Sequence, residues 1–94
     1  MDVYEESERG NRARDLLNNA MFRETIDSLR TAIVDKWRSA PMRDIEGQHE
    51  LKIMDKLLTD IEAYIKKTAD TGKMADIQLE RDTKVAELKR HGIR

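Results

Sequence analysis

The chain has 94 residues, of which 39% are charged and only 4% are aromatic, and its formal net charge is −1. This length suits one domain near the lower limit for building its own core, and so few large side chains favour a helical hairpin, a coiled coil or an oligomer that shares a core. The near-zero charge excludes a global attraction to nucleic acid or to an anionic membrane. The absence of cysteine excludes disulfides, thiol nucleophiles and cysteine metal sites.

Residues 1–18 are expected to form an N-terminal helix with an acidic start. This segment carries scattered apolar residues, and it is the intramolecular candidate to cover any apolar stripe that the rest of the chain leaves open. Those residues are Val3, Tyr4, Ala13, Leu16 and Leu17.

Residues 20–40 carry the clearest amphipathic pattern of the chain. Apolar residues recur there every three or four positions, which predicts a helix with one buried stripe. Asn18 or Asn19 can cap its start, and Ala40 precedes Pro41, which disfavours helical backbone at Ala40 and closes the helix. The stripe consists of Phe22, Ile26, Leu29, Ile33, Trp37 and Ala40.

Residues 43–71 form the next predicted helix, which begins either with Pro41 in its first turn or with Asp44 as its cap. Its apolar stripe alternates strictly by three and four residues, as in a coiled coil, and Leu57 and Tyr64 widen it. Gly72 is placed to end the helix in a left-handed cap. The stripe consists of Leu51, Met54, Leu58, Ile61, Ile65 and Thr68.

The predicted fold is all-α. It is an antiparallel helical hairpin of residues 20–40 and 43–71, flanked by the N-terminal helix and by a weaker C-terminal helix over residues 73–90. The second arm exceeds the first by roughly two turns, so part of its stripe needs a cover from residues 1–18 or from another chain. The sequence therefore predicts a single helical domain, 1–94, completed by oligomerisation.

The tip of this hairpin, "KWRSAPMRDIEG", holds the only tryptophan and the only proline. In one interpretation, Trp37 seals the end of the bundle and Pro41 stops the helix. In the other, Lys36, Arg38 and Arg43 surround an aromatic surface that suits phosphate or a flat base. Lys36, Trp37, Arg38 and Arg43 are thus the candidate surface for a ligand or partner.

No other constellation supports catalysis or a cofactor. Glu46 and His49 have the spacing that helical di-iron proteins use twice, but the motif occurs once here, so no metal site is expected. There is no phosphate-binding loop and no serine with a histidine in a plausible context. The sequence predicts a protein that is not an enzyme.

Two longer stretches, "LLNNAMFRETIDSLRTAIVDKWRSAPMRDIEG" and "LKIMDKLLTDIEAYIKKTADTGKMA", carry a family resemblance. Over residues 16–75 the chain resembles small helical proteins of tailed bacteriophages and prophages, with a recurring W-x-x-[ST/A]-P-x-R-D-x-E-G pattern and a closing T-G-K-x-A. The resemblance implies a phage origin, often near head or packaging genes, and assigns no functional residue.

The leading functional hypothesis is a non-enzymatic phage protein that acts through helix–helix contacts. It would be a homo-oligomeric accessory of the particle or of packaging, or an inhibitor of a host protein. The alternatives are a counter-defence sponge for nucleotides and a small DNA-binding packaging subunit. No apolar run reaches the length of a membrane span and no signal peptide is recognised. The expected location is the cytoplasm of an infected cell, or the virion.

Overall fold

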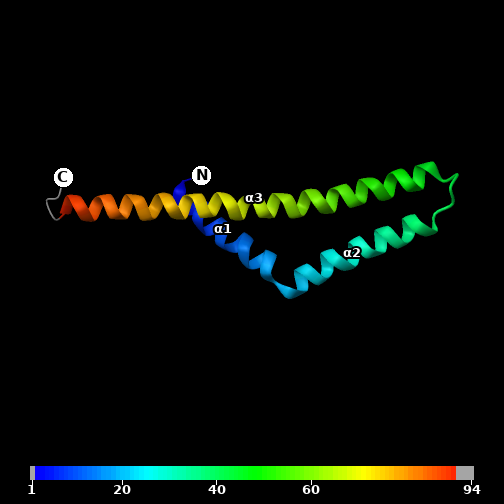
Figure 1. Cartoon of the computed structure of the whole chain (residues 1–94), viewed down its shortest axis with the longest axis horizontal. Helices are drawn as coiled ribbons and strands as arrows, with labels where there is room; N and C mark the ends of the chain where they lie inside the picture. The colour runs from blue at the N-terminus through cyan, green and yellow to red at the C-terminus, as the bar shows by residue number, and fades with distance from the viewer. Residues whose placement is uncertain (1, 91–94) are drawn as a thin grey trace.

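The computed structural model describes residues 2–90 as three α-helices: α1 (Val3–Asn18), α2 (Ala20–Ser39) and α3 (Ile45–Arg90) (Figure 1). No strand occurs among these residues, so the all-α prediction is confirmed. None of the three helices combines the length and apolar character that crossing a membrane requires.

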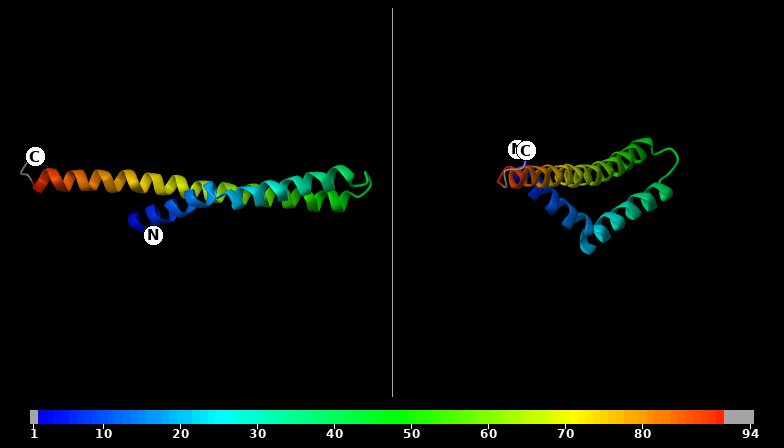
Figure 2. Two further views of the ribbon diagram at one scale, coloured as in Figure 1. Left: turned by 90° about the horizontal axis from the view of Figure 1, so that it is seen from below. Right: turned by 60° about the vertical axis from the view of Figure 1, so that its left-hand side comes forward.

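The molecule is a long rod built around α3. α1 and α2 follow each other along α3 and run in the opposite direction (Figures 1 and 2). The rod measures 75 × 24 × 16 Å and has a radius of gyration of 21.2 Å. A compact domain of this length would have a radius of gyration of about 12 Å. Most side chains therefore face solvent.

Asn19 separates α1 from α2, and this break is needed because the faces of the two helices that turn toward α3 would not line up along one continuous helix. Leu17 is the last half-buried residue of α1, and Phe22 is the first of α2. Five residues of continuous helix would turn the second face about 140° away from the first. Asn19 instead adopts extended backbone (φ −71°, ψ 121°), and its side-chain oxygen accepts a hydrogen bond from the Phe22 amide at 2.9 Å. The break lets both helices face α3.

Replacing Asn19 with alanine is expected to destabilise the protein by about 1 kcal/mol, because the substitution removes this cap. Urea denaturation followed by circular dichroism measures the change. Asn18→Ala, one residue earlier and equally exposed, is the matched control and should change stability by less than about 0.5 kcal/mol. If both substitutions lowered the free energy of unfolding equally, the Asn19 side chain would not be the cap that stabilises α2.

The chain reverses direction between α2 and α3 at residues 40–44. Ala40, before Pro41, is extended as predicted (φ −67°, ψ 137°). Asp44 accepts a hydrogen bond from the Gly47 amide at 3.0 Å and so caps α3, which decides between the two predicted starts. The Gln48 side chain donates to the Pro41 carbonyl at 3.0 Å and holds the turn against the first turn of α3.

The prediction that Gly72 ends a helix is wrong, because α3 continues through it to Arg90. Gly72 instead marks the point where α1 crosses α3. A Cβ on Gly72 would lie inside 3.0 Å of the Gly10 Cα, 3.1 Å from the Gly10 nitrogen and 3.2 Å from the Glu6 carbonyl oxygen. Ala13, Ala69 and Ala75 are buried around the two glycines. Because neither glycine has a side chain, the two helix backbones can come into contact. The two helices predicted for residues 43–71 and 73–90 are therefore parts of the single helix α3.

Polar contacts flank this crossing of α1 and α3. The Asp76 carboxylate accepts a hydrogen bond from the Ser7 hydroxyl and lies 3.4 Å from an Arg14 guanidinium nitrogen. Arg9 donates to the Tyr64 hydroxyl at 3.2 Å. α1 therefore covers the second half of α3 around Gly72 through small and polar residues, while Tyr4 and Leu16 stay exposed. Ile61, in the part of the predicted stripe that this segment was a candidate to cover, remains 48% exposed.

The contact between α2 and the first half of α3 rests on a small apolar cluster. Ile26 and Ile33 of α2 pack with Leu58 of α3, and Phe22 and Leu51 lie against them. None of the residues described is more than 98% buried. This core is small for two helices of such length, which leaves room for further burial by another chain.

Arg30 occupies a position in the α2–α3 seam that a coiled coil would give to an apolar side chain. Its guanidinium pairs with Glu62 and lies 3.9 Å from an Asp55 oxygen. The hydrogen bond to Glu62 raises the pKa of Arg30 above its usual value. Since all three groups are partly exposed, the pairs add little stability.

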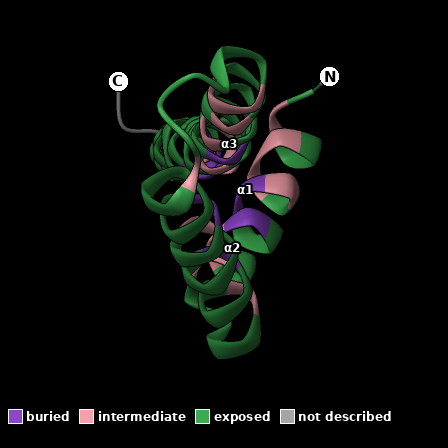
Figure 3. Ribbon diagram, turned by 90° about the vertical axis from the view of Figure 1, so that its right-hand side faces the viewer, coloured by how far each residue is buried: buried purple, intermediate pink, exposed green. Residues whose placement is uncertain are grey.

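The inward face of α3 therefore differs from the predicted stripe. Residues 51, 55, 58, 62 and 65 line the seam, and they include Asp55 and Glu62. Met54 and Ile61, both predicted to be buried, remain 48% exposed. Figure 3 shows the result, with buried residues confined to a thin band between the helices.

Candidate helix-binding surface

Two open grooves flank the α2–α3 seam, one on each side. The first, called the Leu57 groove, has a volume of about 310 Å³. Its walls are apolar except for one lysine at the end near the turn. It is lined by Leu29, Ala32, Ile33 and Lys36 of α2 and by Met54, Leu57, Leu58 and Ile61 of α3.

The Leu57 groove extends along α3 as a line of exposed apolar residues. Met54, Leu57, Ile61 and Tyr64 recur every three or four residues and are 48%, 56%, 48% and 62% exposed. Leu29, at 48%, faces the same side from α2. A helical face with this spacing and this exposure is what an antiparallel bundle buries against a second layer of helices.

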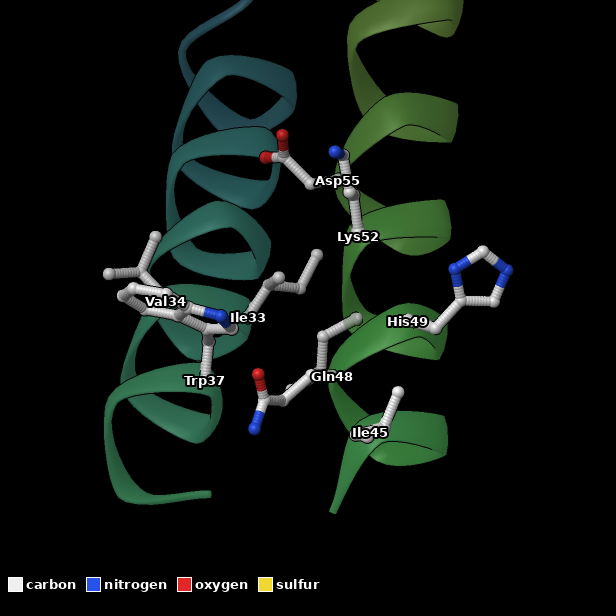
Figure 4. A pocket seen from close by; sticks show the side chains of 9 residues that line it. Ile33, Val34, Trp37, Ile45, Gln48, His49, Lys52 and Asp55 are labelled. Carbon is white, nitrogen blue, oxygen red and sulfur yellow. The ribbon is translucent and has the colours of Figure 1, made fainter. Parts of the chain in front are cut away.

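The second groove, called the Trp37 groove, is larger, at about 590 Å³, and more polar. Trp37 is 56% exposed and lies beside Val34 on α2, while Gln48 lies between the helices and His49 points away from α2 (Figure 4). The prediction that Trp37 seals the bundle end is therefore wrong. The groove is lined by Ile33, Val34, Trp37, Ile45, Gln48, His49, Leu51, Lys52 and Asp55.

The four residues of the predicted surface do not gather in one groove. Trp37 lines the Trp37 groove, whereas Lys36 lines the Leu57 groove on the opposite side of the seam. Arg38 and Arg43 are exposed and line neither groove. Lys52 and Asp55 are the two charged aliphatic side chains that line this groove with Trp37, and the Lys52 side chain extends away from the indole (Figure 4). One lysine beside a carboxylate is a weak arrangement for a phosphate.

Sequence reasoning missed the polar lining of the Trp37 groove and the position of Ala32. Ile45, Gln48, Lys52 and Asp55 also follow a spacing of three and four, but three of these four residues are polar, which hides the pattern from a search for apolar stripes. Ala32, which lines the Leu57 groove, carries too small a side chain to register as part of a stripe.

Glu46 and His49 are both exposed near the start of α3. Within residues 2–90, no group of three or more histidine, cysteine, aspartate or glutamate side chains is placed to hold a metal ion.

A scan of the chain against protein-family models finds no match. Comparisons with curated proteins and with solved structures find no similar protein either.

Proposed function

We propose that the chain is a non-enzymatic protein that works through helix–helix contacts, and that it assembles as a homo-oligomer. In this proposal, the hairpin predicted for residues 20–40 and 43–71 is one layer of a larger helical bundle. The resemblance to small phage proteins suggests the setting: an accessory of the particle or of packaging, or an inhibitor of a host protein, in an infected cell or a virion.

One observation carries this proposal, namely the exposed apolar line of the Leu57 groove. Burying half-exposed Met54, Leu57 and Ile61 together with Leu29 would remove a continuous apolar face from water, and each such side chain contributes on the order of 1 kcal/mol when half of it is buried. The internal cluster around Leu58 is too small to give a long rod much stability by itself. A shared core supplies the missing burial.

We expect self-association to raise the molar mass of the protein in solution above that of one chain. Light scattering at micromolar concentration should give at least twice the chain mass of 11.0 kDa. Ile61→Asp should dissociate the assembly while the chain stays helical, because it puts a charge into the shared face without touching the internal cluster.

Ile45→Asp is the matched control for this experiment. Ile45 is 75% exposed on the same helix but lines the Trp37 groove instead of the Leu57 groove. This variant should keep the oligomeric mass of the wild-type protein. A wild-type protein that stays monomeric at micromolar concentration would contradict the proposal, and so would an Ile61→Asp variant that keeps its full mass.

A further inference from the structure

We infer that the occupant of the Leu57 groove is a second copy of this chain, related by a two-fold axis that runs perpendicular to the helices and passes near Ala32 and Leu57. The inference rests on the proposed self-association and specifies its face and symmetry. In this arrangement α2 packs on α2 of the second copy, and α3 packs on α3, each pair antiparallel. The product is a four-helix bundle around the middle of the Leu57 groove.

The choice of face follows from the lining of the two grooves. Covering the Trp37 groove would desolvate Gln48, Lys52 and Asp55, which costs free energy unless each group finds a new partner. Covering the Leu57 groove desolvates apolar walls and only one charged group, Lys36, which lies at the end of the groove. A lysine there can extend its stem along the surface and keep its ammonium group in water.

The same lysine selects the axis. A two-fold axis parallel to the helices would place the Lys36 side chains of both copies at the same level of the interface, where like charges repel. An axis perpendicular to the helices places them at opposite ends. The repulsion is then removed without any change in the buried apolar face.

The residue order along α3 fits this axis because exposed apolar residues stand at equal distances on either side of Leu57. Ile53 precedes Leu57 by four residues and Ile61 follows it by four, so Ile53 of one copy lies opposite Ile61 of the other, and they are 46% and 48% exposed. Glu50 and Tyr64 stand seven residues to either side, which places a carboxylate opposite a phenol hydroxyl at the edge of the interface. On α2 the central residue is Ala32, whose small side chain allows close approach of the two backbones.

The area of this face is sufficient for a specific dimer. A patch about 30 Å long, the length of α2, and about 18 Å wide covers two adjacent helices. The two copies together would then bury roughly 1,100 Å², which exceeds the approximate 1,000 Å² expected of a biological interface but falls below the approximate 1,200 Å² at which stable complexes begin. A dimer that dissociates on dilution is the expected consequence.

Cysteine cross-linking tests the axis, and the chain has no cysteine of its own to interfere. Ala32→Cys and Leu57→Cys, each made alone, should form a disulfide between copies under mild oxidation. Val34→Cys, on the Trp37 groove, is the control. At equal micromolar concentrations, cross-linking of Ala32→Cys should be roughly a hundredfold faster than that of Val34→Cys, since docking raises the effective thiol concentration to the millimolar range. Urea should abolish the difference.

The outcomes separate this inference from the proposed function. Fast cross-linking of both single variants, with slow cross-linking of Val34→Cys, supports it. Two results with an oligomeric wild-type protein overturn the inference but leave self-association standing. In the first, Val34→Cys cross-links faster than Ala32→Cys and Leu57→Cys. In the second, neither Ala32→Cys nor Leu57→Cys cross-links alone. Cross-linking only in a mixture of Ala32→Cys and Leu57→Cys overturns it too, because that pairing belongs to the parallel axis. A monomeric wild-type protein overturns both.

Discussion

Gly72→Ala is expected to destabilise the protein by about 1–2 kcal/mol, although a glycine-to-alanine change inside a helix normally stabilises it by about 1 kcal/mol. The sign reverses because the new methyl group would lie inside 3.0 Å of the Gly10 Cα. The neighbouring atoms are backbone atoms of α1 and cannot rotate away. α1 must therefore move off α3, which opens the contacts at Ala13, Ala69 and Ala75 and costs more than the helix propensity returns.

Urea denaturation measures the net change, and hydrogen exchange locates it. The amides of α1 should exchange faster in Gly72→Ala, while those of α2 and of the first half of α3 should change little. Lys73→Ala changes the next residue, which is exposed, and serves as the control. Its free energy of unfolding should stay within about 0.5 kcal/mol of that of the wild-type protein. Stabilisation by Gly72→Ala would mean that α1 does not cross α3 at this point.

Leu58→Asp is expected to abolish cooperative folding at room temperature. Leu58 is 8% exposed and joins Ile26 and Ile33 in the apolar cluster of the α2–α3 seam. Removing a buried leucine side chain alone costs about 2–5 kcal/mol. The carboxylate adds a desolvation penalty, and its neighbours Asp55 and Glu62 carry the same charge. Against a total stability of only about 5–15 kcal/mol for a domain, the sum leaves little folded protein.

Circular dichroism with thermal denaturation tests this expectation. The Leu58→Asp variant should show reduced helicity and no sigmoidal transition. Ile45→Asp places the same residue at an exposed position in the first turn of α3, and it should melt cooperatively close to the wild-type temperature. Similar melting of the two variants would show that the Leu58 cluster is not the core of the α2–α3 contact.

The helix pattern and most helix ends could be predicted from local chemistry. Apolar residues every three or four positions indicated helices throughout the described chain. The Asn19 cap, the extended Ala40 before Pro41 and the Asp44 cap are all formed by atoms within a few residues of one another. Such features depend on the local chain. The sequence therefore predicts the extended Ala40 and narrows each cap to two candidates, Asn18 or Asn19 for α2 and Pro41 or Asp44 for α3, between which the structure decides.

The predicted surface was located less well than the helices. The pattern identified the apolar residues Met54, Leu57 and Ile61, but it placed Met54 in the stripe that faces the first arm and left open whether residues 1–18 or another chain covers Ile61. It also grouped Lys36 with Trp37, which are adjacent in sequence but line opposite sides of the seam. A periodic pattern identifies an apolar face but does not say which part of it a neighbouring helix covers.

The sequence by itself determined that this protein is helical, where its chain breaks at Asn19 and where it turns before Asp44. Only the tertiary structure decided that α3 runs through Gly72, and that Asp55 and Glu62 rather than Met54 and Ile61 face α2. The physical reason is that these outcomes depend on groups far apart in the chain. Gly72 packs against Gly10 of α1 where the two helices cross, and Arg30 of α2 pairs across the seam with Asp55 and Glu62.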